Sequence, residues 1–150
     1  MRNVRAVTTI ASDPGTILQA FLEQQHLQAW WGVARSLVEA KPGGLWVLAW
    51  EISDTGIRYV STGIIEKLIP HEYLKISGMT YLNPEREILG PMALEIKVAR
   101  ADENNSTAEV IQSGYQYGGD WDWYYDAVVN AWPVALKMLK EYLEKMKSDV

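Results

Sequence analysis

The stretch DWDWYYDAVVNAWPVALKMLKEYLEKMK, residues 120–147, is the most informative part of this 150-residue chain about its fold. Its apolar residues recur every three or four positions, which is the period of an amphipathic α-helix. At about 1.5 Å per residue such a helix is roughly 40 Å long, so it must cross the whole of a domain of this size. The predicted apolar stripe comprises Trp121, Tyr124 or Tyr125, Val128, Trp132, Ala135 or Leu136, Leu139, Leu143 and Met146.

Several residues of this stretch predict local features of the helix. Pro133 lacks a backbone N–H, so we expect a kink or a break near residues 130–132. Asp120 stands where it can cap the first turn. Asp122 and Asp126 lie four residues apart, as is typical of a solvated face that the helix dipole favours.

The residues before this helix have the two-residue period of β-strands. Gly, Pro, Asn and Asp separate the segments and indicate turns, and residues 81–90 are expected to form a loop or a short helical turn. Trp46, Leu48, Trp50 and Ile52 share one face of their segment, which we take to be the inner face because Glu51 points the other way. The predicted strands are residues 3–10, 33–40, 45–52, 58–69, 73–80, 92–100 and 106–118.

Two short helices are expected between the first strand and the rest. Ser12-Asp13-Pro14 supplies a capping side chain and a proline suited to a first helical turn, so a helix should cover residues 16–23. A second helical piece, residues 26–31, ends at Gly32. The whole chain, residues 1–150, thus reads as one α+β domain. Its antiparallel sheet of six or seven strands curves around the long C-terminal helix and leaves a cavity that the helix cannot fill.

Composition argues against several classes of function. The formal net charge is −5 and no dense run of Lys or Arg occurs, which disfavours nucleic acid as a partner. No segment approaches the roughly 18 apolar residues of a membrane span, and the N-terminus does not resemble a signal peptide, so a cytoplasmic location is expected. The chain has no cysteine, no Gly-rich phosphate loop and no spacing of ligands that suits a metal, so we expect no cofactor.

Four motifs give the chain a resemblance to a known superfamily. They are AFLEQQHLQAWWG (20–32), KPGGLWVLAW (41–50), STGIIEKLIPHEYLKIS (61–77) and AWPVALKMLKEYLEKM (131–146). In this order they resemble the START-like, or SRPBCC, superfamily, whose helix-grip fold is shared with the major birch pollen allergen. The closest likeness is to the heat-shock protein ATPase activator-like branch. The resemblance implies the fold, whereas the superfamily's activities range from lipid and hormone carriage to polyketide cyclisation and co-chaperone function.

The aromatic residues provide the candidate site. Seven Trp and eight Tyr stand against one Phe, and Trp and Tyr rings combine apolar area with a polar N–H or O–H group. This bias suits a cavity with polar groups among its rings, although the same rings could fill a core or a dimer contact. The predicted ligand-binding residues are Trp30, Trp46, Trp50, Tyr81, Tyr115, Tyr117, Trp121, Tyr125, Val128 and Trp132.

Three functions follow as hypotheses. The first is the binding of a small apolar, aromatic or lipid-like ligand in the cavity, with no catalytic residue assigned. The second is a cavity enzyme of cyclase or hydrolase type, which would use a carboxylate such as Asp120, Asp122 or Asp126 with a raised pKa. The third is a co-chaperone-like module that binds a protein partner through an exposed patch and has a filled interior. A homodimer is compatible with each hypothesis.

Overall fold

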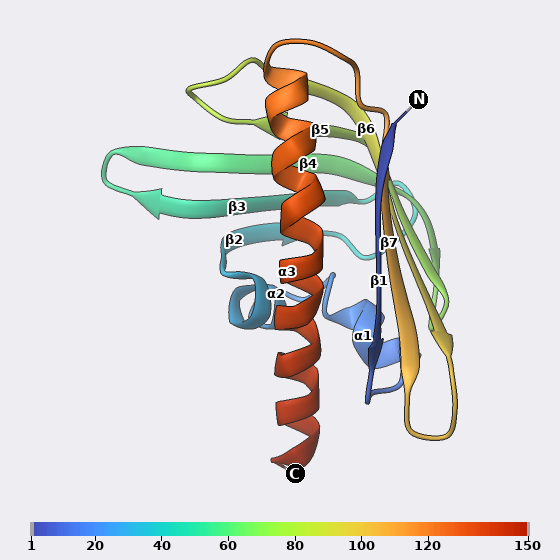
Figure 1. Cartoon of the computed structure of the whole chain (residues 1–150). Helices are drawn as coiled ribbons and strands as arrows, with labels where there is room; N and C mark the ends of the chain where they lie inside the picture. The colour runs from blue at the N-terminus through green and yellow to red at the C-terminus, as the bar shows by residue number, and fades with distance from the viewer. Residues whose placement is uncertain (1, 150) are drawn as a thin grey trace.

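Residues 2–149, which the computed structural model describes, form seven strands and three helices (Figure 1). The chain order is one strand, two short helices, six strands and a long helix, as the sequence predicts. The elements are β1 (Asn3–Ile10), α1 (Pro14–Gln19), α2 (Gln24–Trp31), β2 (Val33–Val38), β3 (Leu45–Ser53), β4 (Gly56–Ile69), β5 (Tyr73–Leu82), β6 (Leu89–Arg100), β7 (Ser106–Ser113) and α3 (Asp120–Ser148).

All seven strands belong to one antiparallel sheet with the order β1-β7-β6-β5-β4-β3-β2. Strands β2 to β6 each pair with the next strand along the chain, because short turns join them. Strand β1 pairs with β7, so the first and last strands lie side by side. The sheet curls around α3, which lies across its concave face (Figure 1). The predicted α+β helix-grip fold is therefore confirmed.

Helix α3 runs without interruption from Asp120 to Ser148, so the predicted break at Pro133 is wrong. Pro133 lies on an exposed face of the helix. The carbonyl that loses its N–H partner there can be hydrated, so the helix continues past the proline. The expected capping role of Asp120 is also wrong. Gly119 is the N-cap residue, and Asp120 accepts hydrogen bonds from the backbone N–H of Glu87 and from Arg86.

The two short helices begin and end as their sequences indicate. The carboxylate of Asp13 accepts a hydrogen bond of 2.9 Å from the backbone N–H of Thr16, and Pro14 opens α1. Helix α1 ends at Gln19, earlier than predicted, and residues 20–22 form a turn. Helix α2 ends at Gly32, which adopts the left-handed conformation with φ 70° that glycine accepts without strain.

The strand predictions are correct in number and differ at their ends. Strand β5 runs to Leu82 and β6 begins at Leu89, so the loop between them covers only residues 83–88. Strand β7 ends at Ser113 rather than at residue 118, because Gly114 takes a positive φ of 96° and leaves the sheet. Ile52 is 49% exposed and departs from its inner-face partners, since Glu51 has a φ of 53° and breaks the alternation.

The core lies between the concave face of the sheet and one side of α3. Leu139 and Leu143 of α3 are fully buried, in one cluster with Ile10 of β1 and Ile17 of α1. Among the residues described, no helix combines the length and apolar character that crossing a bilayer requires. The N-terminal half of α3 faces the inner surfaces of β3, β4 and β5, and there the interior is not filled.

Candidate functional site

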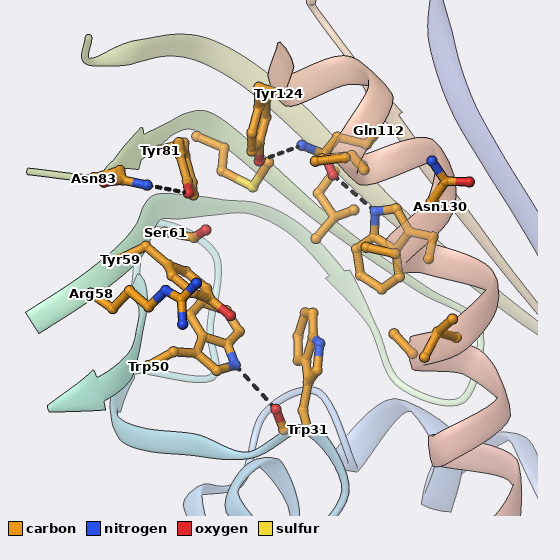
Figure 2. Close-up of a pocket in the computed structure, with 18 of the residues that line it drawn as sticks. Trp31, Trp50, Arg58, Tyr59, Ser61, Tyr81, Asn83, Gln112, Tyr124 and Asn130 are labelled. Carbon is orange, nitrogen blue, oxygen red and sulfur yellow. Dashed lines mark hydrogen bonds between the residues drawn. The ribbon is translucent and has the colours of Figure 1, made fainter. Parts of the chain in front are cut away.

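A cavity of about 600 Å³ lies between the concave face of the sheet and the N-terminal half of α3 (Figure 2). Strands β3 to β7 supply one wall, α3 supplies the opposite wall, and Trp31 enters from α2. The lining residues are Trp31, Trp46, Trp50, Arg58, Tyr59, Ser61, Met79, Tyr81, Asn83, Leu94, Gln112, Trp123, Tyr124, Ala127, Val128, Asn130, Ala131, Trp132, Val134, Ala135 and Met138.

Trp31 is the central ring of this lining. Its centroid lies 5.3 Å from that of Trp50, with the two rings nearly perpendicular, and 5.3 Å from that of Trp132. The ring of Trp50 also stacks on that of Tyr59, with the two centroids 5.1 Å apart. These spacings are those of favourable aromatic pairs. The cavity is therefore bounded by ring faces and edges that can pack against a flat apolar molecule.

Two indole N–H groups hold their rings in place. Trp46 donates a hydrogen bond of 3.0 Å to the carbonyl of Phe21, and Trp50 donates one of 3.1 Å to the carbonyl of Trp31. Both bonds join strand β3 to the segment that contains the short helices. Because these donors are satisfied by the backbone, the faces of the two rings are left as apolar surface.

A chain of buried polar groups lies at the inner end of the cavity. The indole N–H of Trp132 donates to the amide oxygen of Gln112 at 2.9 Å, and the amide nitrogen of Gln112 donates to the hydroxyl of Tyr124 at 3.1 Å. Gln112 is 3% exposed, so its amide would be costly to bury without these partners. Burial raises the pKa of Tyr124, which therefore stays protonated at neutral pH.

The mouth of the cavity carries further polar groups. Asn83 donates from its amide nitrogen to the hydroxyl of Tyr81 at 3.0 Å, and Arg58 pairs with Glu51 at 3.2 Å on the β3–β4 hairpin. Ser61 lies directly opposite Tyr81 on the neighbouring strand. Among the described residues that line the cavity there is no Asp, Glu or His.

The three aspartates considered for acid–base chemistry lie outside the cavity lining. A hydrogen bond from the backbone N–H of Glu87, together with Arg86, lowers the pKa of Asp120. A backbone hydrogen bond at Gly118 and the ion pair with Arg2 lower the pKa of Asp122. Both shifts favour the ionised form, which is opposite to the raised pKa that a general acid at neutral pH needs.

The structure brings about half of the predicted ligand-binding residues together. Those that line the cavity are Trp46, Trp50, Tyr81, Val128 and Trp132. Those that lie outside the lining are Trp30, Tyr115, Tyr117, Trp121 and Tyr125. The difference arises mainly from the position of each residue around its helix. Neighbouring residues of a helix point about 100° apart, so Trp31 and Tyr124 reach the cavity while Trp30 and Tyr125 point elsewhere.

The residues outside the lining have structural partners of their own. Trp30 is buried, donates to the carbonyl of Ala20 at 2.8 Å and stacks on Trp31 at 4.8 Å. The guanidinium of Arg2 lies 4.3 Å from the ring centroid of Tyr117 and 4.5 Å from that of Tyr125. Tyr117 is nevertheless 68% exposed. The contacts of Arg2 attach the N-terminal residues to Tyr117, just before α3, and to Tyr125 near the beginning of α3.

The ring of Tyr115 lies beside Tyr125 and Trp121 of α3. Its centroid is 5.1 Å from that of Tyr125 and 6.4 Å from that of Trp121, and both pairs are edge-to-face. Burial raises the pKa of Tyr115. These rings pack together at the beginning of α3, outside the cavity lining.

The sequence contained a signal for some of the cavity residues that the prediction missed. Gln112 shares its parity with the buried Ala108 and Val110 of β7, so a polar inner-face position could have been recognised. Trp123 and Ala127 lie four apart and follow the helical period of Ala131, which places them together on the flank of α3 at the cavity. Other lining residues depend on how far β4 and its hairpin extend, for which the sequence has no clear signal.

A family model described as activator of Hsp90 ATPase homolog 1-like protein matches residues 12–144. The match spans most of the chain, and the chain belongs to this family. The predicted resemblance to the heat-shock protein ATPase activator-like branch is thus confirmed. No protein with a curated description matches the sequence significantly.

Solved structures with the same fold come from several bacteria. A protein of Mesorhizobium loti is 15% identical, with a TM-score of 0.75, and the match covers 96% of this chain and 98% of that one. A protein of Chromobacterium violaceum is 19% identical, with a TM-score of 0.72 and coverage of 96% and 99%. The Aha1 dimer of Colwellia psychrerythraea is 19% identical, with a TM-score of 0.69 and coverage of 96% and 97%. At such identities the likeness concerns the fold.

Proposed function

We propose that this protein binds a small, largely apolar, aromatic or lipid-like ligand in the cavity between the sheet and α3. The observation that carries the proposal is the cavity itself, whose volume of about 600 Å³ suits a small molecule. Its lining combines aromatic rings with few polar groups, which is the usual composition of ligand sites. A ligand would be held by burial between the rings and oriented by the polar groups of Gln112, Tyr124 and Tyr81.

Titration of intrinsic tryptophan fluorescence tests this proposal. The panel should contain saturated fatty acids of increasing length and fused-ring aromatic compounds, added to the wild type and to Trp50→Phe and Trp132→Phe variants. We expect a saturable change that is reduced in both variants, because both rings line the cavity. Trp121→Phe is the matched control, since this ring lies outside the lining, and it should keep the response. The absence of any response or thermal shift across the panel would contradict the proposal.

The carboxylate enzyme receives less support from the geometry. Asp120 and Asp122 are held as ions by partners outside the cavity, and Asp126 is exposed. Variants Asp122→Asn and Asp126→Asn should therefore keep the ligand affinity of the wild type. A turnover lost in these variants would instead favour the enzyme.

A co-chaperone-like interaction module is the second candidate. The family description favours it, and so do apolar side chains that are exposed on the convex face of the sheet. Leu45 and Ile64 pair across β3 and β4 and are 37% and 40% exposed, and Leu37 of β2 is 56% exposed. The charged double variant Leu37→Lys, Ile64→Lys should abolish binding of a protein partner and leave small-ligand binding intact. Light scattering of the same variant would show whether this face also forms a homodimer.

A further inference from the structure

The hydrogen-bond chain at the inner end of the cavity has a fixed direction. An indole N–H can only donate, so the group of Gln112 that lies 2.9 Å from Trp132 must be its amide oxygen. The amide nitrogen of Gln112 then faces the hydroxyl oxygen of Tyr124 at 3.1 Å. Since an amide NH₂ does not accept hydrogen bonds, Tyr124 is the acceptor in this pair. The O–H hydrogen of Tyr124 therefore remains to be donated.

The same logic applies to Tyr81 at the mouth. The side-chain oxygen of Asn83 accepts a hydrogen bond of 3.0 Å from the backbone N–H of Glu85. Its amide nitrogen therefore donates to the hydroxyl of Tyr81, also at 3.0 Å. Within residues 2–149, neither Tyr81 nor Tyr124 donates its own O–H hydrogen to a protein acceptor.

The two hydroxyls come from opposite walls of the cavity, Tyr81 from β5 and Tyr124 from α3, at a point where the walls meet. The rings of Tyr81 and Tyr124 stack with their centroids 4.4 Å apart and an interplanar angle of 29°. Figure 2 shows both hydroxyl ends on the side of the rings that faces the cavity. Tyr81 is 8% exposed and Tyr124 is 7% exposed, so both donors lie in a largely apolar environment. A buried donor without an acceptor destabilises its surroundings, whereas a ligand oxygen placed there would satisfy it.

The rest of the lining is also rich in donors. The indole N–H of Trp31 has no protein acceptor within the described residues, and Arg58 is the charged residue of the lining. The side-chain oxygen of Asn130 and the hydroxyl oxygens of Tyr59 and Ser61 can accept, but Asn130 is exposed and the two hydroxyls can donate as well. A ligand that carries hydrogen-bond acceptors thus fits this cavity better than one that carries an ammonium group.

We propose that the ligand is a flat, apolar molecule with a carbonyl oxygen, such as an aromatic ketone or quinone, and that this oxygen accepts hydrogen bonds from Tyr81 and Tyr124. The inference rests on the proposed function, because it specifies the chemical class bound in the same cavity. A site that donates hydrogen bonds to a ligand oxygen rejects an analogue that lacks the oxygen, since its buried donors are then left unpaired.

Three ligands of nearly equal size and shape test this inference by isothermal titration calorimetry. They are 2-acetylnaphthalene, which has a carbonyl oxygen, 2-ethylnaphthalene, which has no polar atom, and 2-naphthylmethylammonium, which is a cation. We expect the ketone to bind the wild type about tenfold more tightly than the hydrocarbon, as one or two hydrogen bonds allow. The cation should bind more weakly than either, because the lining offers no carboxylate to pair with it.

Tyr124→Phe and Tyr81→Phe remove one donor each and keep the stacked ring. Each variant should weaken binding of the ketone by about threefold to tenfold, whereas binding of the hydrocarbon should not weaken. Tyr142→Phe is the matched control, because its hydroxyl contacts His26 outside the cavity, and it should bind all three ligands as the wild type does. Thermal melts identify any variant that fails to fold, and the ligand comparison in the wild type tests the inference independently of these variants.

The outcomes separate this inference from the proposed function. Equal affinity of the wild type for the ketone and the hydrocarbon would overturn the inference and leave ligand binding in place. Tightest binding of the cation would also overturn it and would indicate an aromatic cage for ammonium groups. Failure of all three ligands, together with a silent fluorescence panel, would contradict the proposed function itself.

Discussion

The two ends of α3 bury their inward faces in different ways. Toward the C-terminus, Leu136, Leu139 and Leu143 are 2%, 0% and 1% exposed and fill the space against the sheet. Toward the N-terminus, Tyr124 and Trp132 are also buried, yet their rings line a cavity. One amphipathic stripe thus performs two tasks. Branched aliphatic side chains close the interior at one end, and rings with polar groups leave a space at the other.

Different contacts at the two ends allow this fold to tolerate a cavity. The filled end provides the close-packed core on which stability depends. The cavity end is held open by specific contacts, among them the hydrogen bonds of Trp46 and Trp50 to the backbone of the α1–α2 segment. Changes at the two ends should consequently affect different measurements.

The largest effect on stability is expected at the filled end. Leu139→Ala removes a fully buried side chain and leaves a cavity among close-packed neighbours. We expect the free energy of unfolding to fall by about 2–5 kcal/mol, measured by urea denaturation. A loss below about 1 kcal/mol would mean that this end is as loosely packed as the other.

A smaller loss is expected from the polar chain at the cavity. Gln112→Leu removes the acceptor of the Trp132 indole N–H and leaves a buried donor unpaired. The free energy of unfolding should fall by about 1–3 kcal/mol. Gln116→Leu, at an exposed position, should stay within about 0.5 kcal/mol of the wild type. Equal losses in the two variants would show that the buried amide has no special structural role.

The mouth of the cavity should respond in affinity rather than in stability. Ala127 lines the cavity and is exposed on α3, so Ala127→Leu should narrow the entrance and change the free energy of unfolding by no more than about 0.5 kcal/mol. We expect weaker binding of every ligand that the wild type binds. Val129→Leu, on the same helix but outside the lining, should bind as the wild type does, and a matching loss there would argue against the assigned entrance.

Part of the dependence of stability on pH should come from the start of α3, alongside Asp13, Asp102 and Glu144, whose pKa values are also lowered. Hydrogen bonds and paired arginines lower the pKa values of Asp120 and Asp122 below their values in the unfolded chain. A lowered carboxyl pKa contributes stability above the unfolded pKa, and this contribution is lost as the pH falls below about 4. Thermal melts between pH 7 and pH 3 should show this loss, and Asp120→Asn, Asp122→Asn should reduce it. If the double variant loses as much thermal stability between pH 7 and pH 3 as the wild type does, the acid sensitivity comes from other groups.

The parts of the fold that the sequence predicted are those with strong periodicity. The stripe of α3 and the alternation of Trp46, Leu48 and Trp50 in β3 each extend over several repeats, so one ambiguous residue does not change the result. Short turns between the strands then imply an antiparallel sheet. The end of β7 and the alternation of β3 were less predictable, because Gly114 leaves the sheet and Glu51 breaks the alternation through backbone angles that residue type alone does not determine.

The candidate site was harder to predict for a different reason. Whether a residue lines the cavity depends on the direction of its side chain, to within a fraction of a helical turn. Trp30 and Trp31 have the same chemistry and adjacent positions, yet the first is buried against Ala20 and the second lines the cavity. The composition bias toward Trp and Tyr indicated a ring-lined site, whereas the choice of rings required the packing of α2 and α3.

The most direct test of ligand binding in this cavity is a ¹H–¹⁵N spectrum of the seven tryptophan indole N–H groups, recorded during titration with 2-acetylnaphthalene. The cavity predicts shifts for Trp31 and Trp132, which line it, and an unchanged resonance for Trp121, which does not. Shifts confined to Trp30 and Trp121, or no shift in any indole resonance at saturating ligand, would contradict the assignment of this cavity as the binding site.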